Sequence, residues 1–360
     1  MSLNLGFHRL KISDVRRETS DAVSICFDVP RELEPLFVFK AGQHITLRAQ
    51  IGGSDIRRTY SVCVGEQDRE IRIAIKQMRG GVFSTWANQS LQRGQSLDVL
   101  PPLGRFVEPV SAVAAPNYVA LAGGSGITPI LSIMKSVLHA KAESQFTLLY
   151  GNRDSASIMF LEELAGLKNR FLDRLSVFHF LEGEADDIEL FNGRLDRAKC
   201  NEVFSRLVDV SKASAFFVCG PGQMMDAAEA SLASLHVPSG KVLVERFTTS
   251  EISADQIAKN DALQRNAAGT VLTVTLDGRR LKVPFDASKG NILESIQAAG
   301  MSAPYACKGG VCTTCRAKVT EGTVAMKKNY GLSDQEVSEG YVLTCQAVPT
   351  SKEIALTFDN

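Results

Sequence analysis

The sequence has no excess of either charge and no long apolar run. Lysine and arginine together number 40, as do aspartate and glutamate, so the formal net charge is +0. Nucleic acids and anionic surfaces attract chains with an excess of basic residues, which this chain does not have. Its apolar stretches, such as residues 215–219, fall far short of the roughly 20 residues that a membrane-spanning helix needs. We therefore expect no nucleic-acid partner and no membrane partner.

The sequence also lacks the side-chain patterns of hydrolytic enzymes and of secreted proteins. Its 5 histidines are far apart and belong to no serine–histidine–aspartate or paired-carboxylate pattern, so we expect a structural role for each. The first residues do not form a charged segment followed by an apolar one, as a secretion signal does. Of the 8 cysteines, several occur singly, which is typical of reduced cytoplasmic proteins. We expect a cytoplasmic location. The histidines are His8, His44, His139, His179 and His236, and the single cysteines are Cys26, Cys63, Cys200 and Cys219.

The remaining cysteines have the spacing of an iron–sulfur site. Cys307, Cys312 and Cys315 form a C-x4-C-x2-C pattern, and Cys345 stands alone further along the chain. This is the ligand spacing of a plant-type [2Fe–2S] ferredoxin. Glycines 309–310 lie inside the loop, where the absence of Cβ lets backbone N–H groups approach the sulfurs. A structural zinc site is the alternative, but such sites usually combine two short C-x2–4-C clips.

The 360 residues allow two or three domains, and the first is predicted to be all-β. Apolar and polar residues alternate with period two in short segments separated by turns. The pattern favours an antiparallel β-barrel over residues 1–112. Pro101–Pro102 is interpreted as part of a turn near the end of this domain. The alternating segments are 8–12, 22–29, 43–48 and 70–76.

Two runs in this domain could bind a flat ring and a pyrophosphate. In the first, Arg58 can bind a pyrophosphate, Tyr60 can lie against a ring, and Ser61 can hydrogen-bond its polar edge. An ordinary strand with solvated arginines is the alternative. In the second, Gly80–Gly81 precede a predicted helix, whose first N–H groups would form an anion site.

A strand–turn–helix pattern begins near residue 117 and then repeats. The apolar strand 117–122 runs into the glycine turn 123–129 and then into an apolar-periodic helix, with Thr128 as its N-cap and Pro129 as its first residue. This is the phosphate-binding start of a doubly wound α/β unit, although Pro129 breaks the G-x-G-x-x-G pattern. A parallel sheet over residues 113–247 is therefore predicted. Its further strands are 145–150, 175–180, 215–219 and 241–247.

Arg153 follows the second of these strands, at the position where such a sheet contacts the adenosine ribose. An arginine there, rather than an acidic residue, favours the 2′-phosphate of NADPH. Asp154 weakens this preference, so NADH remains possible, and a surface arginine without a coenzyme contact is the alternative.

Residues 248–268 are small and polar, and we interpret them as a linker with a possible helix around 254–263. Residues 269–360 form the predicted ferredoxin domain, an α+β unit of the β-grasp type. It contains a hairpin with a turn at Asp277–Gly278 and a short helix ending near Gly300.

Taken together, these motifs resemble the ferredoxin–NADP reductase superfamily with a plant-type ferredoxin fused at the C-terminus. The resemblance covers nearly the whole chain and implies FAD, NADPH and a [2Fe–2S] cluster as cofactors. It implies that Cys219 and Glu245 lie near the nicotinamide and that Phe247 covers the flavin. The FAD residues that it implies are Arg58, Tyr60, Ser61, Gly80, Gly81, Val82 and Ser84; the nicotinamide-coenzyme residues are Gly124, Gly126, Thr128, Pro129, Arg153, Gly220, Pro221 and Met224; the cluster ligands are Cys307, Cys312, Cys315 and Cys345.

The resemblance also implies an activity. Electrons would pass from NADPH through FAD and the cluster to the oxygenase component of a multicomponent monooxygenase. Two alternatives stay open. One is a reductase for another oxygenase or for a hybrid-cluster protein, and the other is an electron-carrier binding module without turnover of its own.

Overall fold

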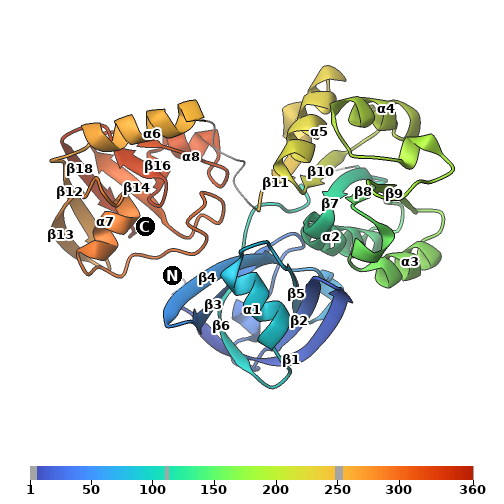
Figure 1. The fold of residues 1–360 in the computed structure, drawn as a ribbon, viewed down its shortest axis with the longest axis horizontal. Helices are drawn as coiled ribbons and strands as arrows, with labels where there is room; N and C mark the ends of the chain where they lie inside the picture. Colours follow the sequence, from blue (N-terminus) through green and yellow to red (C-terminus); the bar gives the residue numbers. More distant parts are fainter. Residues whose placement is uncertain (1–5, 110–112, 248–253, 360) are drawn as a thin grey trace. The chain divides into compact units, whose positions relative to one another are not determined.

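The computed structural model describes residues 6–109, 113–247 and 254–359, with the backbone alone for 254–257. The chain divides into two compact units, Leu5–Thr248 and Thr249–Asn360. Each unit is described by itself below, and Figure 1 gives the element labels.

The first part of the first unit is an antiparallel β-barrel. Its six strands have the order β4-β3-β6-β1-β2-β5, and a bridge between Val62 and Ile73 joins the two ends of the sheet. Helix α1 lies beside the barrel (Figure 1) and contributes Phe83 and Ala87 to its core. The predicted antiparallel barrel is confirmed. Its elements are β1 (His8–Thr19), β2 (Ala22–Asp28), η1 (Glu34–Leu36), β3 (His44–Ile51), β4 (Ser54–Ser61), η2 (Glu66–Asp68), β5 (Ile71–Lys76), α1 (Val82–Ser90) and β6 (Ser96–Leu103).

The predicted turn at Pro101–Pro102 is wrong, because both prolines lie within β6. Along β3, His44 pairs with Leu103 and Thr46 with Leu100, so the register shifts at the two prolines. A proline cannot donate a ladder hydrogen bond and is tolerated at such an irregularity. The sequence showed two residues that break a regular strand but not the bulge that accommodates them.

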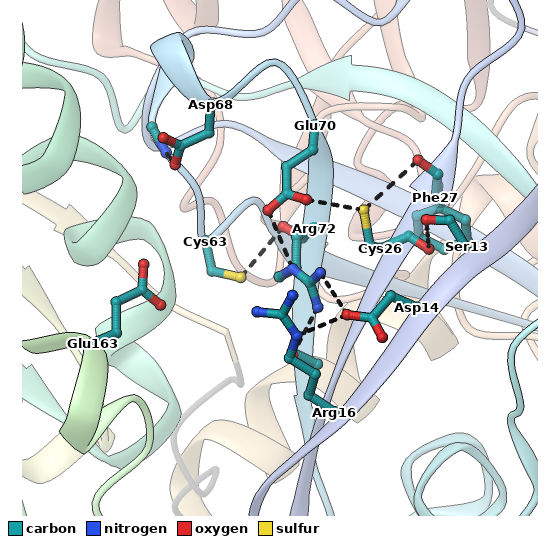
Figure 2. A network of polar contacts seen from close by, with 12 residues as sticks. Ser13, Asp14, Arg16, Cys26, Phe27, Cys63, Asp68, Glu70, Arg72 and Glu163 are labelled. Carbon is teal, nitrogen blue, oxygen red and sulfur yellow. Dashed lines mark hydrogen bonds and ion pairs between the residues drawn. The ribbon is translucent and has the colours of Figure 1, made fainter.

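A buried arginine crosslinks three strands of the barrel (Figure 2). The Arg72 side chain is 5% exposed and donates to Asp14 Oδ2 at 2.9 Å, to Glu70 Oε1 at 3.3 Å and to Ser24 Oγ at 3.2 Å. These partners offset the cost of burying the charge. The Arg72 guanidinium also holds the pKa of Asp14 below its ordinary value. The backbone oxygen of Arg72 accepts from the Cys63 N–H at 2.9 Å, beside the bridge that closes the barrel.

The second part of the first unit is a parallel sheet between two pairs of helices. The strand order is β11-β10-β7-β8-β9, and every neighbouring pair is parallel. Helices α2 and α3 cover one face and α4 and α5 the other (Figure 1). The predicted doubly wound sheet is confirmed. Its elements are β7 (Asn117–Gly123), η3 (Gly124–Gly126), α2 (Ile127–Ala140), β8 (Gln145–Asn152), η4 (Ser155–Ser157), α3 (Leu161–Arg170), β9 (Leu175–Leu181), η5 (Glu189–Phe191), α4 (Arg197–Leu207), β10 (Ala215–Cys219), α5 (Gly222–Ser234), η6 (Ser239–Lys241) and β11 (Val242–Glu245).

The start of α2 differs from the prediction. The helix begins at Ile127, its N-cap is Gly126, and Thr128 is already inside the first turn. The Thr128 hydroxyl donates to the backbone oxygen of Ser125 at 3.0 Å instead of accepting from the helix start. The reason is that the short η3 turn runs directly into α2, with Gly126 itself in helical conformation, so no extended cap residue precedes the helix.

The second unit has a mixed sheet of the order β13-β12-β18-β14-β16 and a separate pair, β15-β17. Helix α7 supplies the buried Ile292, Leu293 and Ile296 to its core. This arrangement confirms the predicted ferredoxin-type α+β domain. Its elements are α6 (Ala254–Asn266), β12 (Val271–Leu276), β13 (Arg279–Pro284), α7 (Ile292–Ala298), β14 (Arg316–Glu321), β15 (Val324–Met326), α8 (Asp334–Ser338), β16 (Tyr341–Leu343), β17 (Ala347–Pro349) and β18 (Glu353–Thr357).

The linker predicted at 248–268 contains helix α6. Its first part, 248–253, lies outside the described residues. Leu263 and Ala267 contact the core of the second unit, and Ala267 is 2% exposed. The second part of the predicted linker therefore packs as a piece of the ferredoxin unit. Among the described residues, no helix is long and apolar enough to cross a membrane.

Candidate functional site

The loop between α7 and β14 carries Cys307, Cys312 and Cys315 of the predicted cluster site, and Cys345 lies between β16 and β17. Backbone N–H groups of Gly309 and Cys312 donate to Cys307 Sγ at 3.3 and 3.4 Å. The N–H of Cys307 and the hydroxyl of Thr314 donate to Cys312 Sγ at 3.4 and 3.3 Å. Such donors stabilise negative charge on sulfur. The loop therefore already has the donor arrangement that thiolate ligands require.

The four thiols are arranged as two pairs. The thiol of Cys312 lowers the pKa of Cys307 to about 5, and the thiol of Cys315 lowers the pKa of Cys345 below its ordinary value. A [2Fe–2S] cluster has two irons with two protein ligands each, so two thiol pairs fit it better than they fit one zinc ion.

The backbone of this loop is strained where it wraps round the sulfurs. Lys308 and Thr313 have positive φ values of 52° and 56°, which is uncommon for residues with a Cβ. Gly310 has φ 80°, and a Cβ there would lie 3.1 Å from Gln346 Cγ. Strain of this kind persists when the surrounding structure fixes it and is concentrated at functional sites.

The cysteines differ in their access to solvent. Cys312, Cys315 and Cys345 are 2%, 3% and 4% exposed, whereas Cys307 is only partly buried. The edge of the loop at Cys307 is therefore the accessible one in the ferredoxin unit.

In the barrel, the predicted flavin residues lie at the end of β4. Tyr60 pairs with Ile45 of β3, and its ring centroid is 5.8 Å from that of Phe83 in α1. Burial raises the pKa of the Tyr60 phenol, so it stays protonated at neutral pH. Arg58 is two residues earlier on the same face and is exposed. Ser61 faces the other way and is 3% exposed.

The start of α1 has the open geometry expected of an anion site. Gly80 has φ 72°, and Gly81 is an N-cap without a side chain to bond the first N–H groups. The Ser84 hydroxyl accepts from the Met78 N–H at 3.0 Å and donates to the Gly81 oxygen at 3.2 Å. Ser84 therefore holds the turn in shape, while Val82 is exposed at the helix start.

In the α/β part, two turns pack directly on each other at the carboxyl ends of β7 and β10. A Cβ on Gly126 would lie 2.1 Å from the backbone oxygen of Cys219, and one on Gly220 would lie 2.9 Å from the Gly123 nitrogen. A Cβ on Gly123 would lie 2.5 Å from Pro221 Cδ. Such closeness requires glycine, and it places the predicted coenzyme residues Gly124, Gly126, Gly220, Pro221 and Met224 together at the point where the strand order reverses.

The same edge of the sheet carries Cys219 and Glu245, which are directly paired between β10 and β11. Cys219 is fully buried, and burial raises the pKa of its thiol, as does the neighbouring Glu245. Glu245 is 7% exposed, and its Oε2 accepts a hydrogen bond from Ser61 Oγ at 3.1 Å. This bond joins the barrel to the α/β part within the first unit.

His44 completes this group, and the sequence analysis did not single it out. Its Nδ1 lies 3.7 Å from Glu245 Oε1, and its Nε2 is buried and has no hydrogen-bond partner among the described residues. His44 faces Ser61 across the β3–β4 pair. His44 and Ser61 are 17 positions apart in the sequence. Only a correct prediction of the pairing between β3 and β4 could therefore have placed His44 beside Ser61.

Arg153 lies just beyond the carboxyl end of β8, the edge to which the glycine turn also belongs. Its Nε contacts Asp154 Oδ2 at 3.0 Å, and its side chain is 68% exposed. Asp154 also accepts from the Ser157 N–H at 2.8 Å as the cap of η4. The neighbouring Asn152 is 6% exposed.

Phe247 lies two residues after Glu245 and is 40% exposed. Thr128 and Pro129 are buried in the first turn of α2, directly after the glycine turn. The structure therefore brings the predicted residues of the first unit to one edge of the sheet, to the adjoining end of β4 and to the start of α1. Among them, Arg58 and Arg153 are the exposed cationic side chains.

Comparison with known proteins divides the chain in the same way. Residues 9–107 match the family model of an oxidoreductase FAD-binding domain, 120–230 that of an oxidoreductase NAD-binding domain, and 274–350 that of a 2Fe-2S iron-sulfur cluster binding domain. These three domains define an NAD(P)H-dependent flavin and iron–sulfur reductase.

The relatives narrow this class. The chain is 40% identical over 353 residues to the E component of 1,2-phenylacetyl-CoA epoxidase of Escherichia coli, covering 98% of both chains. It is 35% identical over 366 residues to the ferredoxin reductase component of 3-ketosteroid-9-alpha-monooxygenase of Mycobacterium tuberculosis, covering 99% of this chain and 97% of the relative. The solved structure of phthalate dioxygenase reductase matches with a TM-score of 0.60 and 26% identity, covering 98% of both chains. The chain belongs to the family of oxygenase reductase components, and the resemblance predicted from its motifs is confirmed.

Proposed function

We propose that this chain is the NADPH-dependent reductase of a phenylacetyl-CoA 1,2-epoxidase. The Ser61–Glu245 hydrogen bond at 3.1 Å carries the reductase part of the proposal, because it joins a flavin-type strand to a nicotinamide-type strand. The identity of 40% over nearly the whole chain to the Escherichia coli epoxidase component supports the choice of oxygenase. The runs 150–153 and 245–247, the length and the order of domains also fit that relative.

The bound cofactors would supply the redox chemistry: hydride acceptance by FAD and single-electron transfer by the cluster. The residues of the chain would bind these cofactors and orient them. Tyr60 and Phe247 provide aromatic surfaces for the flavin ring, and Arg58 provides a cation for the pyrophosphate near the open start of α1. Gly126 and Gly220 allow the two turns to pack on each other, and Gly124, where a Cβ would meet nothing closer than Lys76 Nζ at 4.0 Å, would let the coenzyme approach the backbone closely. The buried Cys219 presents a neutral thiol on the nicotinamide side.

Ser61, Glu245 and His44 would hold the polar edge of the flavin ring. The Ser61 hydroxyl is bonded to Glu245 Oε2. The other carboxylate oxygen faces His44 Nδ1 at 3.7 Å. A hydroxyl that is bonded to a carboxylate has a fixed direction, so its oxygen can be presented to the ring edge. We assign to these three residues the orientation of the ring for hydride transfer, which moves two electrons and one proton together.

Coenzyme choice follows from Arg153. Its guanidinium can bind a 2′-phosphate in the way that arginine binds phosphate elsewhere. The ion pair with Asp154 at 3.0 Å competes with that phosphate. We therefore propose that NADPH is preferred and that NADH is also used.

The [2Fe–2S] cluster is assigned to Cys307, Cys312, Cys315 and Cys345. The two thiol pairs and the N–H donors from Gly309 and Cys312 support this assignment. The accessible edge at Cys307 is the side on which an oxygenase component would receive electrons.

The test is reconstitution with purified oxygenase components. The purified protein should show flavin bands and the red shoulder of a [2Fe–2S] cluster, and it should support NADPH-dependent turnover of phenylacetyl-CoA by the other epoxidase components. The oxygenase of 3-ketosteroid 9α-hydroxylation is the matched comparison, since its reductase is also a relative over the whole chain. Faster turnover with that oxygenase would reject the epoxidase assignment. A coloured protein that oxidises neither NADPH nor NADH would instead indicate an electron-carrier module.

A further inference from the structure

Arg246 stands between Glu245 and Phe247 and is held by helix α5. Its Nη2 lies 2.7 Å from Asp226 Oδ1 and 2.5 Å from Glu229 Oε2. The Arg246 side chain is 13% exposed, whereas those of Asp226 and Glu229 are 60% and 41% exposed. The two carboxylates are three residues apart on α5 and therefore share one face of the helix.

Successive side chains of an extended strand point to opposite sides. The Glu245 carboxylate bonds Ser61 on the barrel side, while the neighbouring Arg246 is bonded to α5. Strand β11 has only four residues, Val242–Glu245, and lies at the edge of the sheet with β10 as its one neighbour. Backbone hydrogen bonds to β10 alone therefore fix the position of the end of this strand only weakly.

We propose that Arg246 is a positioning residue that fixes the end of β11, so that Glu245 meets Ser61 and Phe247 is aimed at the flavin. This inference rests on the proposed roles of Glu245 and Phe247. Helix α5 begins at Gly222, directly after the Cys219–Gly220–Pro221 turn. The Arg246 clasp, defined as its bonds to Asp226 and Glu229, thereby ties the strand end that carries Glu245 to the helix that follows the nicotinamide-side turn.

The geometry suits an orienting function better than a purely stabilising one. An ion pair whose carboxylates are exposed to solvent, as those of Asp226 and Glu229 are, contributes little to stability. A planar guanidinium bound to two carboxylates, however, fixes the direction of the side chain and of the backbone that carries it. A hydroxyl–carboxylate contact at a reaction site tolerates little displacement, since an error of about 1 Å can cost about a hundredfold in rate.

The test measures single-turnover reduction of the FAD-loaded protein by NADPH. Arg246→Ala should lower the limiting rate about tenfold, which corresponds to about 1.4 kcal/mol, while the NADPH concentration for half-maximal rate changes less than twofold. The double variant Asp226→Asn/Glu229→Gln changes only exposed helix positions and should have the same effect. The charge exchange Arg246→Glu/Glu229→Arg should recover most of the rate that Arg246→Glu loses. The control is Arg206→Ala, which breaks a 3.3 Å ion pair with Glu202 on α4 and should leave the rate unchanged.

Limiting rates within twofold of the parent protein in both Arg246→Ala and the helix double variant would overturn the proposal, as would a charge exchange no faster than Arg246→Glu alone. If Arg246→Ala does not fold, the helix double variant decides the matter. Glu245→Gln in the same assay separates the proposal for Arg246 from the proposed role of Glu245. A loss of rate there with none in the clasp variants rejects the clasp alone, whereas no loss there rejects the assigned role of Glu245 as well.

Discussion

Replacing Ser61 by alanine tests the contact on which the proposed reductase site depends. Ser61 is 3% exposed and donates to Glu245 Oε2 at 3.1 Å, so the substitution leaves a buried carboxylate short of a partner. A hydrogen bond to a charged group contributes about 1.5–3 kcal/mol. We expect Ser61→Ala to destabilise the first unit by an amount in that range.

The effect on rate should be distinct from the effect on stability. If Ser61 and Glu245 orient the flavin ring for hydride transfer, Ser61→Ala should lower the rate of FAD reduction about a hundredfold. Because both residues act through one hydrogen bond, the Ser61→Ala/Glu245→Gln double variant should be scarcely slower than the slower single variant. Additive losses would mean that the two groups act independently.

The assay is stopped-flow reduction of bound FAD by NADPH, with thermal unfolding measured in parallel. Ser132→Ala is the matched control, because the Ser132 hydroxyl is also fully buried and also joins the barrel to the α/β part, donating to the Val64 oxygen at 2.6 Å. It should lower stability and slow the reduction of FAD much less than Ser61→Ala does. The reasoning is refuted if Ser61→Ala reduces FAD within twofold of the parent rate, or if Ser132→Ala slows it equally.

Four further predictions follow from individual contacts. Cys312→Ser should abolish NADPH-driven turnover by the oxygenase while leaving NADPH-dependent ferricyanide reduction largely intact, and loss of both in a folded protein contradicts a linear electron route. Arg153→Ala should lower kcat/KM for NADPH about tenfold and leave that for NADH nearly unchanged, consistent with one charged hydrogen bond; an unaltered ratio of the two argues against a 2′-phosphate contact. Gly126→Ala places a Cβ 2.1 Å from the Cys219 backbone oxygen and should destabilise the protein by about 1–3 kcal/mol in a thermal unfolding assay. The control is Gly166→Ala in α3, where a Cβ would meet nothing within 4 Å; it should stabilise the protein by about 0.5–1 kcal/mol. Because Arg72 lowers the pKa of Asp14 in the folded state, the stability from this pair is present above pH 3.8 and is lost as the pH falls through the lower folded value; denaturant titrations between about pH 5 and pH 3 should show a steeper loss in the parent protein than in Asp14→Asn.

The parts of this protein that the sequence predicts well are those governed by local pattern. The cysteine loop is predicted from the spacing of Cys307, Cys312 and Cys315, because cluster ligation fixes their separation in the sequence. The glycine turn before α2 is recognisable because an apolar strand and an apolar-periodic helix flank it. The alternating segments gave most barrel strands for the same reason.

The parts that it does not predict depend on partners distant in the chain. His44 belongs to the candidate site only because it lies beside Ser61 of another strand and Glu245 of the other half of the unit. The start of α2 was misplaced because Thr128 has the composition of a cap, yet the η3 turn leaves it inside the helix. A similar limit applies to Arg246, whose two partners lie on α5.

Helix α2 explains how the two halves of the proposed reductase site are held in register. Its N-terminus follows the glycine turn that we propose for the coenzyme, and its middle contacts the barrel. Ser132 donates to the Val64 oxygen, and Lys135 Nζ contacts Asp68 Oδ2 at 2.5 Å and Glu163 Oε1 at 2.7 Å. Val64 and Asp68 follow soon after the end of β4, where Ser61 lies. One helix therefore connects the segment proposed to bind the coenzyme to the segment that carries the proposed flavin-side hydroxyl. Secondary structure and buried polar contacts, not a flexible loop, set the distance between the two segments, as the proposed site requires for placing two rings within less than about 1 Å.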